Sequence, residues 1–596
     1  MKTVRRRVVR SASLAAAGLL TIGALVVPAS VSAVGAATIA RPQGAGPPVP
    51  ASGMGTQAAL DNPRCRHDDP KYGPYGRFDT TELGNGAPCV KAFKAGDDNG
   101  GATSQGVTKN TITVVAIIPN EDQQKTDPVK PTLRAAGGTA STYQNSFYDY
   151  MLPQMRFYET WGRDIEVKFV KSSGNDEAAQ RADLLTVKAM KPFAAIVYAQ
   201  APMSTPPFTV LETGLAQAKI VTIGYSATAK QAQAQEPYRW NASDSQAGAI
   251  NSAEVMGKQL TGKKAQYGGD DVKNQTRKFG VIYDPTATDY ASFTSTLAKY
   301  KGKVTTPIQF SATTEADQVA TQAATAVTKM KAAGVTTVVN FSAPFTDLMK
   351  AADNQEWTPE WFYTGTGFSD LAILARGYPQ TQAKHGFGLS AIAAIVKPED
   401  VTPPAVSYQD QVDPLNWYWG KDVGTGASRI AAPIFAWLLP GLQMAGPTLT
   451  PKTFQQGLFA MPPRGGAIDN QPYTSTFAWG KGPKLPYNAH AYSGLDFAPF
   501  WYDPTTNGPS NGVNLVGDGV NWFVNGGKRY ISTTWSTTPI KWFDKSDAVF
   551  QFTSVPHLGY VGDCNDCPSH TGNANPEAPS NSAIVFKAGG SGASAA

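Results

Sequence analysis

Histidine is scarce in this sequence, and the residue patterns of common enzymes are missing. The 596 residues include five histidines, none of which has metal-ligand spacing with another: His67, His385, His490, His557 and His570. The chain also lacks a Gly-x-Ser-x-Gly elbow, a phosphate-binding Gly-rich loop and a dinucleotide fingerprint. The acidic pairs Glu121-Asp122 and Asp270-Asp271 stand in polar stretches, where we expect water to solvate them. These absences predict a protein that is not an enzyme and that uses neither a metal nor a cofactor.

Long apolar runs are missing as well. Residues 11–27 form a weakly apolar run that is short for a membrane span, and no later segment reaches about 18 uninterrupted apolar residues. Basic residues precede this run and the small residues Val31-Ser-Ala33 follow it, which is the order of a secretory signal. We therefore expect a cleaved signal peptide over residues 1–33 and a secreted or cell-envelope protein, periplasmic or extracellular. Arg5-Arg6-Arg7 also fits a twin-arginine signal loosely, so the export route stays open.

No cysteine follows the apolar run, so a lipoprotein anchor is not expected. The formal charge of +6 falls to +1 when the five basic residues of the signal are removed. A nearly neutral mature chain gives no reason to expect a nucleic-acid partner.

Cysteine is also rare, but its count is even. In an exported chain, four cysteines favour two disulfides, and proximity along the chain favours Cys65 with Cys89 and Cys564 with Cys567. A redox or metal role for Cys564-Asn-Asp-Cys567 is the alternative. The surrounding Gly/Pro/Ser-rich tail, which lacks a βαβ pattern, makes that alternative the weaker one.

What the sequence does contain is a repeated alternation of strands and helices. Residues 34–107 are rich in Gly and Pro and show no period, so we expect a leader with a disulfide rather than a packed domain. From Thr111 onward, apolar β-branched runs alternate with helical stretches, and after residue 270 the pattern starts again. The predicted strands cover residues 111–119, 164–170, 193–198, 219–223, 278–283, 303–310, 336–341 and 360–364. The fold class is therefore α/β, with two Rossmann-like, doubly wound lobes. Residues 520–530 are predicted to form a hairpin that turns at Asn525-Gly526.

Several segments together resemble a known family. They are Gly106-Val-Thr-Lys-Asn-Thr-Ile-Thr-Val114, Ile223-Gly-Tyr-Ser-Ala-Thr228, Val281-Ile-Tyr-Asp284 with Tyr290 behind it, and Asn525-Gly-Gly-Lys-Arg-Tyr530. Over about residues 108–545, their order and spacing resemble the type I periplasmic-binding-protein family. The branch is that of branched-chain amino acid and amide ABC transporter substrate-binding proteins, with a leucine-binding-protein-like domain.

The resemblance implies two lobes joined by a three-strand hinge. Its crossings would fall near residues 238–241, near 384–389 and between about 471 and 496. Lobe 1 would comprise residues 108–237 and 386–470, and lobe 2 residues 238–385 and 471–560. Residues 561–596 would form a flexible tail.

In doubly wound sheets the ligand lies beyond the carboxyl ends of the strands. The candidate ligand-binding residues that follow predicted strands are Asn120, Gln200, Ser204, Ser226 and Thr228 in lobe 1, and Tyr290, Phe345 and Thr366 in lobe 2. The alternative is that these residues only cap helices or close turns, as Ser and Thr often do. Aromatic residues near strand ends, among them Tyr225 and Phe368, would suit a flat or apolar solute.

One position departs from the family. Amino-acid binders carry an acidic residue, which neutralises the ligand ammonium, where this chain has Thr366 in Tyr363-Thr-Gly-Thr-Gly367. Because a buried ammonium without a counter-charge is costly, a branched-chain amino acid ligand is in doubt. Asp370 is an alternative source of charge, although it resembles a helix N-cap.

The resemblance implies an extracellular, monomeric solute-binding protein that closes around a small molecule and delivers it to an ABC permease. The alternative is a ligand sensor or an envelope protein without a transport role, because one fold hosts many functions.

Overall fold

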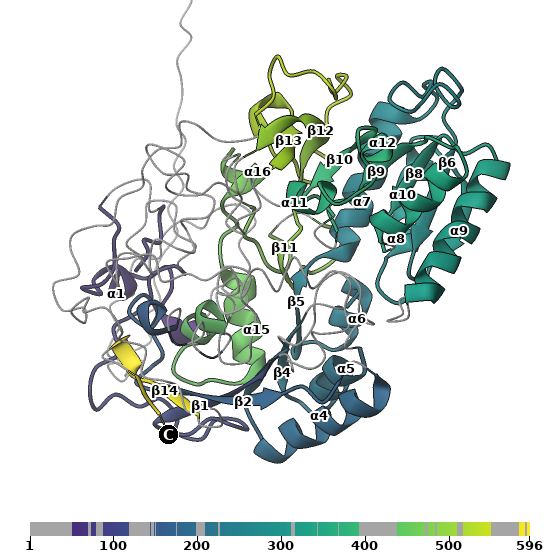
Figure 1. Ribbon diagram of the computed structural model, residues 1–596. Helices are drawn as coiled ribbons and strands as arrows, with labels where there is room; N and C mark the ends of the chain where they lie inside the picture. Colours follow the sequence, from purple (N-terminus) through teal and green to yellow (C-terminus); the bar gives the residue numbers. More distant parts are fainter. Residues whose placement is uncertain are drawn as a thin grey trace, which may run out of the picture. The chain divides into compact units, whose positions relative to one another are not determined.

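The computed structural model describes residues 50–68, 73–78, 87–118, 144, 148, 151–174, 176–197, 209–224, 227–311, 316–342, 344–366, 369–391, 438–470, 472, 475–482, 485–508, 517–549, 583–590 and 593–595. The predicted signal peptide and the pair Cys564 and Cys567 lie outside these residues. The described strands form two sheets in which parallel pairing dominates, and helices connect them (Figure 1). The predicted α/β class with two doubly wound sheets is therefore confirmed.

Sheet 1 has the strand order β11-β5-β4-β3-β1-β2-β14-β15. These strands are β1 (Thr111–Ile118), β2 (Asp164–Lys171), β3 (Ala194–Val197), β4 (Val221–Gly224), β5 (Arg239–Ser243), β11 (Ala491–Ser493), β14 (Ile584–Phe586) and β15 (Ala593–Ala595). All are parallel except β14 and β15. The helices that follow β2, β3 and β4 are α4 (Glu177–Met190), α5 (Thr209–Gln217) and α6 (Ala229–Ala234).

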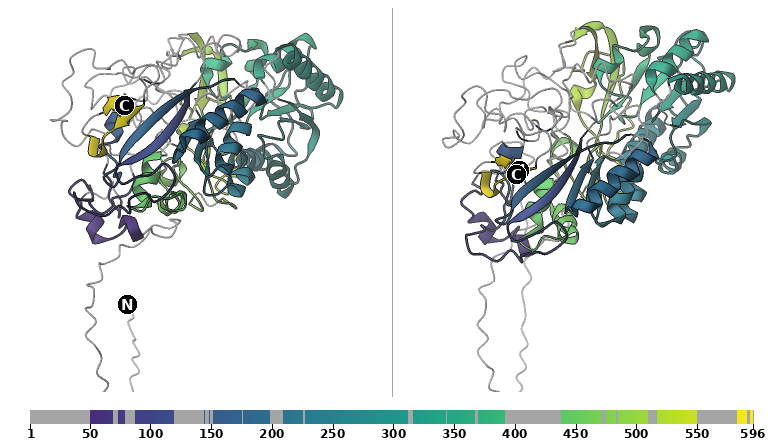
Figure 2. Two further views of the ribbon diagram at one scale, coloured as in Figure 1. Left: turned by 90° about the horizontal axis from the view of Figure 1, so that it is seen from below. Right: turned by 60° about the horizontal axis from the view of Figure 1, so that its bottom comes forward.

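The central strand β1 shows why this sheet is covered on both faces. Val114, Ala116 and Ile118 belong to a core that includes α15 (Pro451–Ala460), whereas Val115 and Ile117 pack with α4 and α5. Figure 2 shows these helices on opposite faces of the sheet. A strand buried on both faces has a continuous apolar sequence, which is the pattern that predicted β1.

The leader packs more closely than its composition predicted. It contains η1 (Pro50–Ser52) and α1 (Gln57–Leu60), and its Met54, Phe78 and Val90 are buried in the core of sheet 1. The predicted disulfide between Cys65 and Cys89 is present. The absence of a period hid this packing, because the apolar contacts of the leader are made with distant parts of the chain rather than within it.

Arg163 fixes the end of the leader to sheet 1. Its guanidinium is buried and donates hydrogen bonds to the backbone carbonyls of Asn99, Gly101, Thr108 and Pro447. Burial lowers the pKa of Arg163 to about 10.

Sheet 2 has the order β13-β12-β10-β9-β8-β6-β7. Its strands are β6 (Phe279–Tyr283), β7 (Val304–Gln309), β8 (Thr337–Asn340), β9 (Glu360–Tyr363), β10 (Gly386–Ser390), β12 (Ala498–Gly508) and β13 (Gly517–Phe523). Its helices are α7 (Ser245–Val255), continued by η4 (Met256–Leu260), then α8 (Tyr290–Lys299), α9 (Ala316–Ala332), α10 (Phe345–Asn354), α11 (Ala372–Ala375) and α12 (Gln380–Ala383). Pro307 lies in β7, at the edge of the sheet, where its missing N–H is tolerated.

The predicted hairpin over residues 520–530 is wrong. β13 ends at Phe523 and pairs antiparallel with β12, while η6 (Asn525–Gly527) leads to Tyr530, which pairs with Phe497. β13 pairs with β12 along its length, whereas a turn at Asn525-Gly526 would have left it to pair with the short segment that follows.

The described chain passes between the two sheets at several points. It leaves sheet 1 after β5 for α7, and it returns from sheet 2 after β10, since α15 packs on sheet 1. It passes again from β11 to β12, after the short helix α16 (Gly466–Asp469). Finally, β14 pairs with β2, and η7 (Ala588–Gly590) and β15 follow it. Residues 584–586 thus form a sheet strand within the range predicted as a flexible tail.

Among the described residues, no helix combines the length and apolar character that a membrane span requires.

Candidate ligand site

The predicted ligand-binding residues follow strands whose carboxyl ends lie at one edge of each sheet. Helices α5 and α7 begin after β3 and β5 in sheet 1, and α8 and α10 begin after β6 and β8 in sheet 2. Helix N-termini present free N–H groups that favour polar or anionic ligand atoms. Four of the eight predicted residues, Asn120, Gln200, Ser204 and Ser226, lie outside the described residues. The other four can be placed.

Tyr290 is the first residue of α8 and stacks on Tyr283, the last residue of β6. The ring centroids are 4.0 Å apart and the planes differ by 5°. The side chain of Asp289 caps the helix by accepting the Ser292 N–H at 2.9 Å. Burial, with Tyr283 alongside, raises the pKa of the Tyr290 hydroxyl. A neutral, half-buried phenol at the start of a helix is suited to covering an apolar or aromatic ligand. Tyr283 was not among the predicted ligand-binding residues, although it stands at the end of a predicted strand.

Thr366 follows β9 at the same edge. Its hydroxyl lies 2.8 Å from the Thr364 hydroxyl and 3.3 Å from the Phe341 carbonyl oxygen. Its methyl group approaches Gly248 in α7 so closely that a Cβ on this glycine would lie 3.0 Å from it. Phe341 in turn contacts Phe293 edge to face, at 5.4 Å, and Phe293 stacks with Tyr290 at 6.4 Å. Thr366 and Tyr290 are therefore linked indirectly, through the backbone carbonyl and ring of Phe341 and the ring of Phe293.

Thr228 is the N-cap of α6. Its hydroxyl accepts the Gln231 N–H at 3.2 Å, and the Gln231 side chain accepts the Thr228 N–H at 2.8 Å. This capping box accounts for its position without a ligand.

Phe345 lies on the other face of sheet 2. It is buried and stacks with Tyr363 at 4.5 Å and with Tyr378 at 5.8 Å. Its core contains Ile282 and Val338, whereas Tyr290 packs with the core of the opposite face. The structure thus does not bring Phe345 and Tyr290 together.

Asp370 is bonded to the exit of β10. Its Oδ2 atom accepts the Ser390 hydroxyl at 2.6 Å and the Ala391 N–H at 2.9 Å, and the residue is buried. The side chain is therefore held in the protein, where it stabilises the end of the strand.

Asp244, which was not among the predicted ligand-binding residues, directly follows β5 at the carboxyl edge of sheet 1. It caps α7 by accepting the Ala247 N–H at 2.8 Å, and it accepts the Tyr487 hydroxyl at 2.7 Å. Burial raises the pKa of Asp244, and the hydrogen bond from Tyr487 opposes that shift. Nearby, Gln246 donates to the Ser292 hydroxyl at 2.9 Å, so α7 is tied to α8 and to the Tyr290 region.

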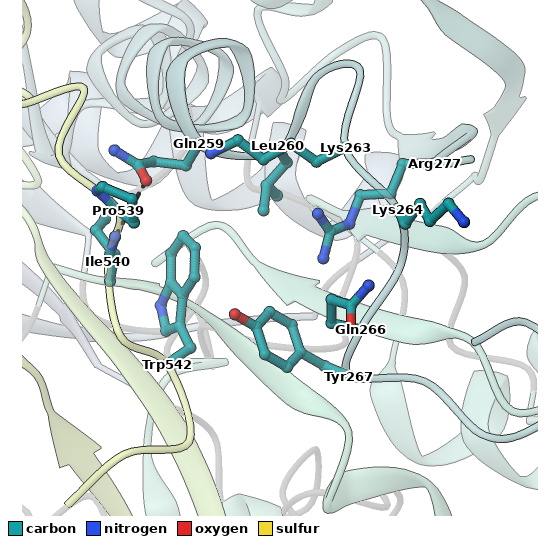
Figure 3. A pocket seen from close by; sticks show the side chains of 10 residues that line it. All are labelled: Gln259, Leu260, Lys263, Lys264, Gln266, Tyr267, Arg277, Pro539, Ile540 and Trp542. Atoms are coloured by element: carbon teal, nitrogen blue, oxygen red, sulfur yellow. Dashed lines mark hydrogen bonds between the residues drawn. The ribbon is translucent and has the colours of Figure 1, made fainter. Parts of the chain in front are cut away.

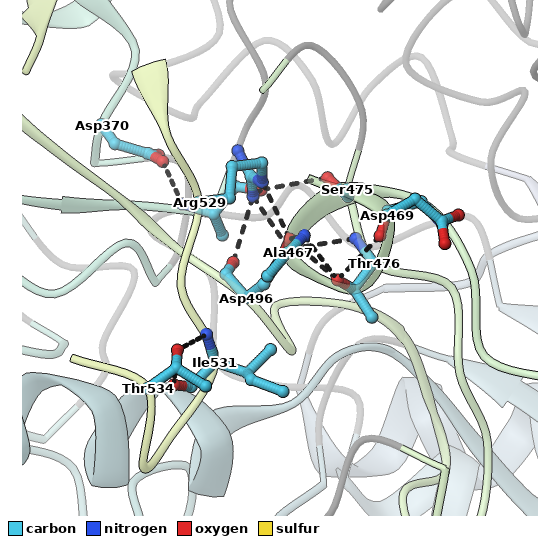
Figure 4. A network of polar contacts seen from close by, with 11 residues as sticks. Asp370, Ala467, Asp469, Ser475, Thr476, Asp496, Arg529, Ile531 and Thr534 are labelled. Carbon is cyan, nitrogen blue, oxygen red and sulfur yellow. Dashed lines mark hydrogen bonds and ion pairs between the residues drawn. The ribbon is translucent and has the colours of Figure 1, made fainter. Parts of the chain in front are cut away.

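A buried ion pair ties together two of the segments that connect the sheets (Figure 4). Arg529 Nε and Nη2 donate to the carboxylate of Asp496, each at 3.0 Å, and both side chains are fully buried. Asp496, between β11 and β12, also accepts hydrogen bonds from Thr476 and the Ala467 N–H. Arg529 Nη2 reaches the carbonyl of Ala391, directly after β10, at 2.9 Å. Arg529 therefore links these two connecting segments, by an ion pair with Asp496 and by a hydrogen bond to Ala391.

Within the part of the chain that the structure describes, no group of three or more His, Cys, Asp or Glu side chains is arranged to hold a metal ion.

Comparisons with known proteins give matches among solved structures alone. Neither a protein-family model nor a curated protein matches this chain. Among solved structures, it is similar to a fatty acid ABC transporter substrate-binding protein from Thermomonospora curvata, with 13% identity, 73% of this chain and 96% of that chain covered, and a TM-score of 0.44. Substrate-binding proteins of ABC transporters are what this chain is similar to.

Two further examples differ in ligand. One is an ABC transporter solute binding protein from Rhodopseudomonas palustris HaA2 in complex with p-hydroxybenzoic acid, with 14% identity, coverage of 71% and 98%, and a TM-score of 0.45. The other is a leucine-, isoleucine-, valine-, threonine- and alanine-binding protein from Brucella ovis, with 11% identity, coverage of 73% and 98%, and a TM-score of 0.44.

Proposed function

We propose that this protein is an extracellular solute-binding protein that closes around a small molecule and delivers it to an ABC permease. The observation that supports this proposal is the connection of two doubly wound sheets by several chain crossings, after β5, after β10 and between β11 and β12. A ligand that contacts both carboxyl edges would favour a closed form, and a permease would distinguish that form from the open one.

The ligand we propose lacks a free α-ammonium group. Thr366 offers a hydroxyl and no charge, and Asp370 is already bonded to Ser390 and Ala391. The stacked pair of Tyr283 and Tyr290 supports a ligand with a flat or apolar part. Thr228, with Ser226 before it, would contact the same ligand from sheet 1.

A thermal-shift screen over amino acids, amides, ureas, aromatic acids and sterol fragments tests the binding role. A ligand that binds only the folded state raises the midpoint of unfolding. We expect a member of the uncharged or acidic classes to raise the midpoint and to contract the particle in small-angle X-ray scattering. A ligand that binds without contraction would contradict closure and favour the alternative of a sensor or an envelope protein.

Matched variants test whether Thr228, at the edge of sheet 1, contributes to ligand binding. Thr228→Ala and Thr450→Ala each remove the N-cap of a helix with the same capping box, in α6 and in α15. We expect a similar loss of stability from both, about 1 kcal/mol, and a loss of ligand affinity from Thr228→Ala alone. If both variants bind the ligand as the original chain does, Thr228 lies outside the site.

A further inference from the structure

A cavity lies at the edge of sheet 2 opposite to Tyr290 and Thr366, beside the amino ends of its parallel strands. It has a volume of about 370 Å³, at the lower end of small-molecule sites. Its walls come from η4, from the loop that precedes β6 and from the segment near residue 540: Gln259, Leu260, Tyr267, Arg277, Ile540 and Trp542 (Figure 3). Arg277 precedes β6 and its partner Glu360 begins β9, whereas Tyr290 and Thr366 follow the carboxyl ends of strands. The cavity is therefore separate from the candidate site described above.

Two of the three guanidinium nitrogens of Arg277 are bonded to Glu360. Its Nε and Nη2 atoms donate to Glu360 Oε2 and Oε1, both at 2.8 Å. The Glu360 side chain is fully buried and also accepts the N–H groups of Gln266 and Tyr267 and the Thr337 hydroxyl. With the described residues, Arg277 Nη1 makes no hydrogen bond, and the guanidinium faces the cavity (Figure 3). A rigid guanidinium with free N–H groups is a donor for a carboxylate.

Tyr267 supplies a second donor. Its hydroxyl points into the cavity and makes no hydrogen bond within the described part of the chain (Figure 3). The ring is fixed by Phe543 at 4.8 Å and by Phe387 at 5.0 Å, and the guanidinium carbon of Arg277 lies 5.7 Å from the ring centroid. Burial raises the pKa of this hydroxyl, so it stays protonated and able to donate.

The remaining wall is apolar and firmly anchored. The ring of Trp542 packs on Phe387 at 5.0 Å, and Leu260 and Ile540 line the same side. Gln259 holds the segment in place by donating to the carbonyls of Ser536 and Thr538 and accepting the Ile540 N–H. A fixed wall costs little entropy when a ligand packs against it.

The charge around the cavity favours an anion. Lys263 and Lys264 are exposed and line it, whereas the carboxylate of Glu360 is buried and bonded to Arg277. We propose that this cavity binds a small organic carboxylate whose apolar or aromatic part packs on Trp542, with the carboxylate between Arg277 Nη1 and the Tyr267 hydroxyl. This inference does not depend on the proposed transport function.

Isothermal titration calorimetry with phenylacetate tests the inference, with 2-phenylethanol and sulfate as comparison probes. We expect phenylacetate to bind, 2-phenylethanol to bind at least roughly tenfold more weakly, because a hydrogen bond to a charged group is lost, and sulfate to show no comparable binding. Equal binding of the alcohol, binding of sulfate alone, or no binding of phenylacetate at millimolar concentration would overturn the inference.

Single-residue variants test where phenylacetate binds. Tyr267→Phe removes only the donor and should weaken phenylacetate binding by roughly tenfold. Tyr300→Phe, which removes a hydroxyl outside the cavity, should leave it unchanged. Lys264→Glu should weaken binding, and Lys301→Glu, at another exposed lysine, should not. If instead Tyr290→Ala abolishes binding and Tyr267→Phe does not affect it, the probe occupies the carboxyl-edge site and the cavity is not a binding site.

Discussion

The ring of Tyr290 is stacked flat on the ring of Tyr283, with their centroids 4.0 Å apart. The pair joins the end of β6 to the start of α8, and the cap provided by Asp289 fixes the helix in this position. Tyr290 is half-buried, so one face of its ring is supported by protein while the residue keeps contact with solvent. The stacking and the helix cap therefore hold the ring in place without a ligand.

Replacement of Tyr290 by alanine is expected to weaken binding of the transported solute. Buried aromatic anchors commonly contribute about 2 kcal/mol or more, which corresponds to roughly a thirtyfold change in Kd. Calorimetry with the ligand found by thermal shift measures the change. Tyr300→Ala removes the tyrosine at the other end of α8 and is the matched control, which should keep the affinity. Unchanged affinity in Tyr290→Ala would place this residue outside the pocket.

Leucine, isoleucine and valine are expected to bind weakly or not at all. At Thr366 there is no carboxylate to pair with an α-ammonium, and an unpaired buried ammonium is costly. Calorimetry that gave micromolar leucine binding, about −8 kcal/mol, would show that another acidic residue supplies the charge.

Asp370→Ala distinguishes a structural role at the end of β10 from a role in ligand binding. Because its carboxylate accepts hydrogen bonds from Ser390 and Ala391, we expect the variant to lose about 1–3 kcal/mol of stability in urea denaturation. Its affinity for the true solute should not change. Loss of affinity with unchanged stability would instead assign Asp370 to the ligand.

Arg529→Met is expected to destabilise the protein by about 3–5 kcal/mol, because it leaves the carboxylate of Asp496 buried without its cation. Urea denaturation measures this loss. Arg181→Met is the control, since Arg181 pairs with Glu177 on the exposed face of α4 and should change stability by less than about 1 kcal/mol. Equal effects in the two variants would mean that the buried pair contributes little.

Asp503 is expected to make stability depend on acid pH. Burial raises the pKa of its carboxyl, but hydrogen bonds from Lys545, Thr505 and Thr506 together lower that pKa by more. The folded-state pKa therefore lies below the usual range. The unfolded pKa is about 3.9, so this stabilisation is present above that value and is lost as the pH falls below it.

Lys545→Met should make that pH dependence shallower between about pH 5 and pH 2. Because Lys545 is 49% exposed, the effect near neutral pH should stay within about 1 kcal/mol. Urea midpoints measured across this range test the prediction, with Lys481→Met as the control. An identical acid profile in both variants would contradict it.

The strands that open each lobe could be predicted from sequence because their signal is local. The run Thr111–Ile118 is β-branched and apolar, and the run Phe279–Tyr283 begins the same pattern again. The end of the second run then located Tyr290, and the end of the predicted strand over residues 360–364 located Thr366.

Which side chains face that edge was decided by the tertiary structure. Phe345 and Tyr290 both follow predicted strands, yet one packs in the core on one face of sheet 2 and the other lies on the opposite face. The sequence spacing does not distinguish these faces, because each residue begins a helix whose direction depends on the packing of the whole sheet.

The sequence by itself determined the α/β class, the two repeats and the pairing of Cys65 with Cys89. Only the tertiary structure decided that the leader enters the core of sheet 1, that residues 584–586 pair with β2 and that Arg277 pairs with Glu360 beside a cavity. Each of these contacts joins segments far apart in the chain. Their stability comes from apolar burial and charge pairing between distant side chains, which leave no period in the local sequence.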